Sequence, residues 1–211
     1  MRKTIPETDI YAVLSDACSL GRGNVETSRL LLEAGVKIIQ YREKDFPARR
    51  RYEECVAIRQ LCSEHGACFI VNDDAGLAVA CGADGLHLGQ DDFPPEAARR
   101  VVGEEMIIGL SVSTPEEIDR ALKISEIDYL GVGPIFATST KHDAPAPGGI
   151  TLLDYALKRS KLPVVAIGGI RRDNIGSLVR RGCKCFAIIS DLVGAADLSQ
   201  RVSDLRNSRS K

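Results

Sequence analysis

The residues best suited to chemistry gather in three short polar stretches, at positions 40–44 (QYREK), 72–74 (NDD) and 87–92 (HLGQDD). Each stretch follows a run of β-branched or apolar residues, which predicts a polar group at the end of a β-strand. Side chains alternate along a strand, so Gln40, Arg42 and Lys44 are expected to point to the same side. Two cations and an amide on one side favour an anionic ligand. The alternative is a solvated loop in which Arg42 pairs with Glu43.

Asp73 and Asp92 are the candidate metal ligands. Two carboxylates at the ends of neighbouring strands can hold Mg²⁺, which takes one or two protein carboxylates and fills its other positions with water and substrate phosphates. A catalytic zinc site would need several His or Cys ligands, and the three histidines show no clustered spacing. His87 lies inside an apolar strand and is expected in the core or behind the site. The alternative for the aspartates is helix capping or an Asx turn, a role that Asp74 suits well.

A second group of candidates lies in the C-terminal half of the chain and is rich in hydroxyls and glycines. Thr138, Ser139 and Thr140 are followed by Lys141 on a loop shaped by glycine and proline, a combination that suits an oxyanion. This loop belongs to the longest irregular segment of the chain, which predicts either a lid carrying Lys141 or a disordered connector. Gly168-Gly169 allows backbone N–H groups to approach an anion closely.

Two serines end further predicted strands. Ser111 can donate a hydrogen bond to a phosphate, or it can be an ordinary strand-end hydroxyl. Ser190 ends the last predicted strand, and the loops after strands seven and eight are the usual phosphate site of an eight-stranded α/β barrel. The residues therefore indicate two anion sites, one of them with a metal ion. That arrangement fits a condensation in which diphosphate is the leaving group.

Eight short apolar runs alternate with eight longer helix-patterned segments. The predicted strands are residues 10–14, 36–41, 68–72, 85–88, 106–110, 129–132, 163–167 and 185–189. The predicted helices are residues 25–34, 48–65, 76–81, 94–101, 115–124, 152–159, 172–181 and 195–205. Strands that alternate with helices predict a parallel sheet, and eight such units in about 200 residues predict a (β/α)8 TIM barrel. The loops at the C-terminal ends of its strands would form the active site.

The alternative fold is an open, doubly wound sheet. Its dinucleotide-binding version needs a G-x-G-x-x-G turn directly after the first strand, and Gly21-Arg22-Gly23 comes too late and lacks the third glycine. Thr114 before Pro115, with Glu117 three residues later, predicts a capping box at the start of one barrel helix. We therefore predict a single (β/α)8-barrel catalytic domain over residues 1–211.

Composition excludes several classes of partner. The chain has 211 residues, 44% of them hydrophobic, and a formal net charge of -1, which argues against nucleic acid or a membrane surface as the main partner. No stretch approaches the roughly 20 apolar residues of a membrane helix. The seven cysteines include no C-x-x-C pair, so a disulfide framework or a zinc site is not expected. We expect a cytoplasmic protein with small-molecule partners, and the sequence is compatible with a homo-oligomer.

Seven motifs in order carry a family resemblance. They are QYREK, VNDD, HLGQDD, GLSV, TSTK, AIGGI and IIS, each at a predicted strand end. Together they resemble the thiamine-phosphate synthase family over nearly the whole chain. Members of that family couple 4-amino-2-methyl-5-pyrimidinylmethyl diphosphate to a thiazole phosphate, giving thiamine phosphate and diphosphate. Two departures stand out: Ser15-Asp16 replaces the usual Thr-Asp, and Tyr41 takes a position expected to be aliphatic.

The resemblance implies a role for each matching residue. The residues that would contact the pyrimidine diphosphate are Gln40, Arg42, Lys44, Asn72, Ser111 and Lys141. Among them, the catalytic candidates are Arg42, Lys44, Ser111 and Lys141. Mg²⁺ would be held by Asp73 and Asp92. The residues that would contact the thiazole phosphate are Thr138, Ser139, Thr140, Gly169, Ile189 and Ser190. The implied reaction is dissociative: the bond to diphosphate breaks first, and the thiazole nitrogen attacks the resulting cation.

Three alternatives remain open. A thiazole tautomerase-like paralogue would share the phosphate loop, but it has no need for the set formed by Arg42, Lys44, Asp73, Asp92 and Lys141. A pentose-phosphate epimerase needs paired acid/base groups or a transition-metal site, which the sequence does not offer. A non-catalytic sensor of thiamine precursors gains little from a full set of diphosphate-stabilising groups. The synthase is therefore the favoured interpretation.

Overall fold

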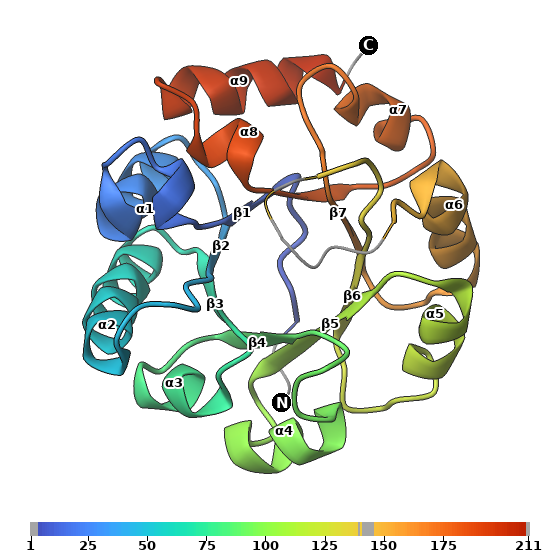
Figure 1. Ribbon diagram of the computed structural model, residues 1–211, viewed down its shortest axis with the longest axis horizontal. Helices are drawn as coiled ribbons and strands as arrows, with labels where there is room; N and C mark the ends of the chain where they lie inside the picture. Colours follow the sequence, from blue (N-terminus) through green and yellow to red (C-terminus); the bar gives the residue numbers. More distant parts are fainter. Residues whose placement is uncertain (1–3, 139, 141–145, 210–211) are drawn as a thin grey trace.

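Eight parallel strands form a closed barrel and follow one another around it in chain order. The computed structural model describes residues 4–138, 140 and 146–209. The strands are β1 (Ile10–Val13), β2 (Ile38–Tyr41), β3 (Cys68–Asn72), β4 (Gly85–Leu88), β5 (Ile107–Val112), β6 (Tyr129–Val132), β7 (Val164–Ile167) and β8 (Cys185–Ile188). Figure 1 looks down the barrel, with the strands at the centre and the helices around them. The predicted (β/α)8 fold is confirmed, and the alternative of an open sheet is wrong.

Helices cover the outside of the barrel. They are α1 (Gly23–Glu33), α2 (Ala48–Glu64), α3 (Ala75–Ala80), α4 (Pro95–Val102), α5 (Pro115–Ala121), α6 (Gly149–Arg159), α7 (Ile175–Val179), α8 (Ser190–Val193) and α9 (Leu198–Ser208). The sequence predicts one helix after the last strand, whereas the structure has two, α8 and α9. Gly194 ends α8 by donating its N–H to the Ser190 carbonyl, and Asp197 begins α9 by accepting from the Gln200 N–H.

Local capping follows the sequence closely. The Asp74 side chain accepts the Leu77 N–H at the start of α3, as predicted. Thr114 caps α5 by accepting the Glu117 N–H, but the predicted capping box is incomplete. The Glu117 carboxylate instead accepts from the N–H and hydroxyl of Ser113, one residue further back. A cap at α3 leaves the neighbouring Asp73 available for the site.

The barrel interior changes from apolar to polar along the strand direction. Its lower part is filled by Ile5, Ile38, Cys68, Ile70, Ile107 and Val165. Its upper part carries Gln40, Asn72, His87 and Ser111, which line a pocket. Asn72 of β3 lies in register with His87 of β4. Because all eight strands end on the same side, these polar groups converge at one face.

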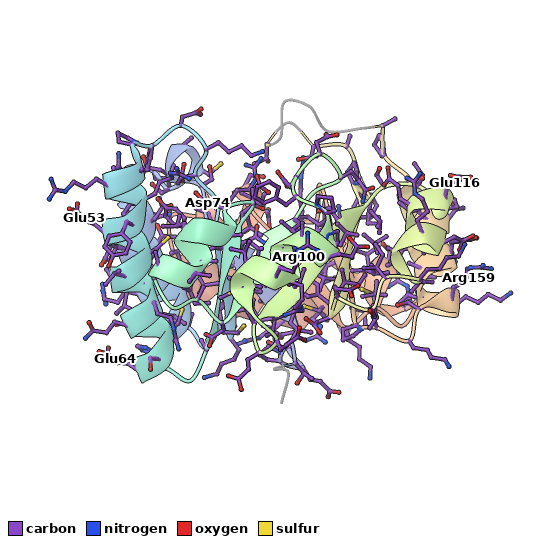
Figure 2. The ribbon with its side chains drawn as sticks, turned by 90° about the horizontal axis from the view of Figure 1, so that it is seen from below. Glu53, Glu64, Asp74, Arg100, Glu116 and Arg159 are labelled. Atoms are coloured by element: carbon purple, nitrogen blue, oxygen red, sulfur yellow. The ribbon has the colours of Figure 1, made fainter. Side chains whose placement is uncertain are left out.

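The two faces of the barrel can be told apart in the side view of Figure 2. Asp74, which directly follows β3, lies at the upper end of the barrel, while Glu64, the last residue of α2, lies at the lower end. The upper face is therefore the one at which the strands end. Among the described residues, no helix combines the length and the apolar character that crossing a membrane requires.

Candidate active site

A pocket of about 910 Å³ opens where the strands end. Its wall contains all the predicted site residues that the structure describes: Gln40, Arg42, Lys44, Asn72, Asp73, Asp92, Ser111, Thr138, Thr140, Gly169, Ile189 and Ser190. Two further predicted residues, Ser139 and Lys141, lie outside the described part of the chain, and so does most of the predicted lid. The contacts that the resemblance assigns to these two residues stay predictions.

Charged side chains from β2, β3 and β4 meet on one side of this pocket. Lys44 Nζ lies 3.1 Å from Asp73 Oδ2. Burial and the neighbouring Asp92 carboxylate raise the pKa of Asp73 to about 6, although Lys44 acts in the opposite direction. Two carboxylates here repel each other more than one lysine can offset. The pair therefore favours binding of an additional cation.

The backbone at Asp73 is unusual for a residue with a side chain. Its φ is 63°, in the left-handed region that Asp adopts more readily than most residues. The Asp73 N–H donates to the His87 carbonyl at 2.8 Å, which ties the end of β3 to β4. This turn directs the Asp73 side chain into the pocket while Asp74 caps the helix behind it.

Asp92 is fixed by its own loop. The Gly89 N–H donates to Asp92 Oδ2 at 2.7 Å. A Cβ at position 89 would lie only 3.1 Å from the same oxygen, so glycine allows this close approach. Asp92 does not cap α4, which was its alternative role. Pro94 occupies the N-cap position of that helix and makes no side-chain capping bond.

Asp73 and Asp92 fit Mg²⁺ better than a transition metal. No cluster of three or more His, Cys, Asp or Glu side chains able to hold a metal ion occurs within residues 4–138, 140 and 146–209. Two carboxylates are too few for a structural or catalytic zinc site. They suffice for Mg²⁺, which commonly takes one or two protein carboxylates together with phosphate oxygens and water.

The alternative for residues 40–44 was a solvated loop in which Glu43 pairs with Arg42. In the structure, the Glu43 carboxylate has other partners. Its Oε1 accepts the Asp16 N–H at 2.6 Å and the Asn24 amide at 3.2 Å. Arg42 meanwhile lines the pocket itself. The residues at the end of β2 thus divide into an acidic one that anchors the loop and cations that face the cavity.

Ser111 is held from behind by a buried imidazole. His87 Nε2 lies 2.8 Å from Ser111 Oγ, and His87 Nδ1 lies 2.7 Å from the Tyr129 hydroxyl. Burial lowers the pKa of His87 to about 4, so the ring is neutral near neutral pH. The Gln90 side chain also fixes this strand end by donating to the Ser111 carbonyl. His87 takes the supporting place that its position in an apolar strand predicts.

Sequence patterns missed two residues beside this imidazole. Tyr129 and Tyr11 are buried inside the barrel, with their hydroxyl oxygens 2.9 Å apart. Their positions read as ordinary strand residues. The available signal was glycine inside predicted strands, at Gly109 and Gly131, which often marks close approach of another group.

The opposite side of the pocket is rich in hydroxyls. Thr140 Oγ1 lies 3.5 Å from Ser190 Oγ, which joins the loop after β6 to the start of α8. The Thr140 N–H donates to Thr138 Oγ1 at 3.3 Å. The structure thus brings Ser190 next to Thr140, which lies 50 positions earlier in the sequence and beside Thr138.

Gly168 and Gly169 have a local structural purpose besides the predicted approach of an anion, which stays a prediction. Both have positive φ, 99° and 61°. A Cβ on Gly168 would lie 2.5 Å from Pro134, and a Cβ on Gly169 would lie 2.4 Å from the Ala137 carbonyl oxygen. The glycines therefore allow the loop after β7 to pack against the loop after β6. The sequence expectation attributed them only to close approach of an anion.

Comparison with known proteins agrees with this geometry. The family model described as thiamine monophosphate synthase matches residues 10–192. A thiamine-phosphate synthase of Pelotomaculum thermopropionicum is 50% identical over 200 residues, which cover 95% of this chain and 91% of the relative. A second, from Lawsonia intracellularis, is 42% identical, with 95% and 92% of the two chains covered. The solved thiamine phosphate pyrophosphorylase from Pyrococcus furiosus superposes with a TM-score of 0.86 at 36% identity, covering 96% of this chain and 95% of that one.

The chain belongs to the thiamine monophosphate synthase family. The resemblance carried by the seven motifs is therefore confirmed. Membership makes the chain an enzyme of the transferase class. It also restricts the competing interpretations, because the similar curated proteins are themselves synthases.

The two departures from the expected family pattern have local explanations in the structure. Tyr41 is buried on the outer side of β2, and its hydroxyl lies 3.0 Å from Glu54 Oε2 on α2. Ser15 directly precedes a short 3-10 turn over Asp16–Cys18. Neither side chain lines the pocket. Both departures thus lie outside the pocket wall of this chain.

Proposed function

We propose that the chain catalyses the Mg²⁺-dependent coupling of 4-amino-2-methyl-5-pyrimidinylmethyl diphosphate with a thiazole phosphate. The products are thiamine phosphate and diphosphate. The observation that carries this proposal is the composition of a single pocket, in which a lysine and a carboxylate pair face a cluster of hydroxyls. One side suits a metal-bound diphosphate and the other suits a singly phosphorylated partner.

The charged side would stabilise the leaving group. Arg42 offers a planar fork of N–H donors to phosphate oxygens, while Lys44 acts as a compact charge. Ser111, held by His87, adds a hydroxyl at the end of β5. As the bond to diphosphate breaks, negative charge builds on the departing oxygens, and groups fixed in advance around them lower the barrier. Lys141 would add a further positive charge from the loop after β6.

Asp73 and Asp92 would hold the Mg²⁺ ion. Bound there, the metal would supply positive charge to the diphosphate oxygens. Lys44 contacts Asp73 directly, so this lysine can also orient the carboxylate toward the pocket. The raised pKa of Asp73 supports the assignment, because a carboxylate disfavoured by burial and by a like charge gains most from a cation.

The hydroxyl side would hold the attacking partner. Thr138, Thr140 and Ser190 offer neutral donors for phosphate oxygens, and Ser139 would join them. Gly169 and Ile189 complete this wall. The thiazole nitrogen carries its own lone pair, so attack needs no general base. His87 is consistent with that, because both ring nitrogens contact hydroxyl groups.

The test is a coupling assay on purified protein. It contains the pyrimidine diphosphate, thiazole phosphate and Mg²⁺, with EDTA as the metal control. Two adjacent aspartates provide matched variants. Asp73→Asn removes the proposed ligand charge and keeps a residue that tolerates positive φ. Asp74→Asn removes the neighbouring charge and keeps a side chain suited to capping α3.

We expect thiamine phosphate to form only with metal, and to be lost in Asp73→Asn but retained in Asp74→Asn. Equal losses in the two variants would contradict the ligand assignment. Absence of product in the unmodified protein, with thiazole phosphate still bound, would favour a tautomerase-like or sensor function. Isomerisation of a carboxylated thiazole phosphate would then distinguish those two.

A further inference from the structure

A continuous line of hydrogen bonds crosses the interior of the barrel below the pocket. Gln40 Nε2 lies 2.7 Å from the Tyr11 hydroxyl, which lies 2.9 Å from the Tyr129 hydroxyl. Tyr129 lies 2.7 Å from His87 Nδ1, and His87 Nε2 lies 2.8 Å from Ser111 Oγ. The two ends, Gln40 and Ser111, line the pocket, whereas the tyrosines between them are buried.

The barrel is built around this line. A Cβ on Gly109 would lie 2.0 Å from the Tyr129 ring, and a Cβ on Gly131 would lie 2.9 Å from the His87 ring. Glycine in the middle of these strands therefore creates the space that the two rings occupy. Four strands besides β2 contribute to the line, so its geometry is set by the register of the barrel.

Each link has one proton to share, so its direction determines the next. If Gln40 donates to Tyr11, the Tyr11 hydroxyl is left to donate to Tyr129. Tyr129 then donates to His87 Nδ1, which leaves the imidazole proton on Nε2. That proton goes to Ser111 Oγ, and the Ser111 hydroxyl proton is free for the pocket.

The geometry of the middle groups makes the line directional. Burial raises the pKa of Tyr11 and of Tyr129, so both hydroxyls keep their protons and each has one proton to donate. The His87 ring lies between two hydroxyl groups, with one hydroxyl on each ring nitrogen. A neutral imidazole has one donor nitrogen and one acceptor nitrogen, which makes it a directional link.

We propose that Tyr11, Tyr129 and His87 are positioning residues that run this line from Gln40 to Ser111 and turn the Ser111 hydroxyl into a hydrogen-bond donor for a bound phosphate group. This inference rests on the proposed function for the identity of the ligand. The direction of the line can be measured without any ligand.

The first test reads the imidazole tautomer by nitrogen NMR on protein labelled at histidine. The chain has three histidines, so His65→Gln and His142→Gln identify the other two signals and leave the line intact. We expect a protonated Nε2 and an unprotonated Nδ1 on His87. A protonated Nδ1 would overturn the proposal, because Ser111 would then donate to the ring and not to the pocket.

Two tyrosine variants provide a matched comparison. Tyr129→Phe removes the donor to His87 Nδ1, so the ring should lose its single tautomer. Tyr11→Phe also deletes one buried hydroxyl, but it leaves Tyr129 able to donate to His87. We therefore expect the His87 signals to change in Tyr129→Phe and to persist in Tyr11→Phe. Unchanged signals in both variants would contradict the directional line.

Kinetics provide the second readout. Tyr129→Phe should lower kcat roughly 10- to 100-fold, as is typical when a group that orients a functional residue is removed. Tyr11→Phe should lower it less. The loss should fall on kcat more than on KM, because the departing diphosphate gains charge in the transition state. If Tyr129→Phe and Tyr11→Phe have the same kcat loss and the same melting temperature, the two tyrosines contribute through packing, and the positioning role is refuted.

The two proposals fail in different ways. An unmodified protein that forms no thiamine phosphate but shows the Nε2 tautomer would refute the proposed function and keep the line. Full coupling activity together with a protonated Nδ1 on His87 would support the proposed function and refute the directional line.

Discussion

The two halves of the pocket are built on different principles. The charged half, formed by Arg42, Lys44, Asp73, Asp92 and Ser111, comes from the strand ends β2 to β5 and contains ionised side chains already in contact. The hydroxyl half, formed by Thr138, Thr140, Gly168, Gly169 and Ser190, comes from β6 to β8 and contains mainly neutral groups, with Arg171 as the charged side chain that also lines the pocket after β7. The strands β2 to β5, which carry the charged half, lie next to one another in the barrel in Figure 1.

The difference shows what each half needs in order to work. In the charged half, polar side chains are fixed by partners: Lys44 by Asp73, Asp92 by the Gly89 N–H, and Ser111 by His87. In the hydroxyl half, shape is fixed by glycines that let two loops pack together. Removing charge should therefore reduce kcat, whereas adding volume should disturb binding and stability.

The strongest test of the comparison is removal of the Lys44 charge. Lys44→Ala should lower kcat roughly 100- to 1,000-fold, the range found when one fixed group that stabilises transition-state charge is removed. The matched control is Lys37→Ala, which removes a lysine near the opposite end of β2, where its Nζ donates to the His65 carbonyl. Steady-state coupling kinetics measure both. Similar losses in the two variants would mean that net charge, and not position, matters.

Added volume tests the hydroxyl half. Gly169→Ala would place a Cβ 2.4 Å from the Ala137 carbonyl oxygen, so the loop after β6 must shift. Gly182→Ala is the control, since that glycine also has positive φ but open space around it. Overpacking should lower the free energy of unfolding of Gly169→Ala by about 1–3 kcal/mol more than that of the control. It should also raise KM for thiazole phosphate. Urea unfolding and kinetics would measure both effects, and identical behaviour of the two variants would refute the packing argument.

The sequence predicts the barrel and most of its pocket for a simple physical reason. Strand and helix periods are local, and parallel strands of a barrel end on one side, so residues at strand ends must converge. Asp73 and Asp92 reach the pocket wall by this argument alone. What each lining residue does for a substrate stays a prediction.

Most of the features that the sequence patterns missed depend on contacts between distant segments. Tyr11 and Tyr129 meet across 118 positions of sequence, at a distance set by barrel register. Gly169 is adjacent in space to Ala137, which local patterns do not reveal. The break between α8 and α9 is an exception, because Gly194 and Asp197 were visible signals that the prediction of one helix overlooked.

The stability of the fold should depend on pH through His87, which contacts Ser111 of the charged half. The folded protein binds a proton on His87 only near pH 4, while the unfolded chain does so at the ordinary pKa of 6.5. His87 therefore contributes stability above the unfolded value that is lost as pH falls toward the folded value, although the Asp92 charge opposes the shift. The His87 contribution lost between pH 7 and pH 5 should be about 2 kcal/mol, and the raised pKa of Asp73 acts in the opposite direction in this range. In urea unfolding at the two pH values, His87→Gln should therefore lose less stability on acidification than the unmodified protein, by about that amount, with His65→Gln as control. An unchanged loss of stability in His87→Gln would assign the dependence to another group.

The smallest effect should come from a single hydroxyl. Thr140→Ala removes one neutral donor from the hydroxyl half and should raise KM for thiazole phosphate roughly 2- to 10-fold, the value of one net hydrogen bond. The effect on kcat should be slight, because a phosphate far from the breaking bond gains no charge during the reaction. Thr140→Ser restores the hydroxyl without the methyl group and should restore KM. If serine behaves like alanine, the methyl group and not the hydroxyl is what position 140 contributes. A large fall in kcat would instead show that this half also stabilises the transition state, which would remove the distinction between the two halves.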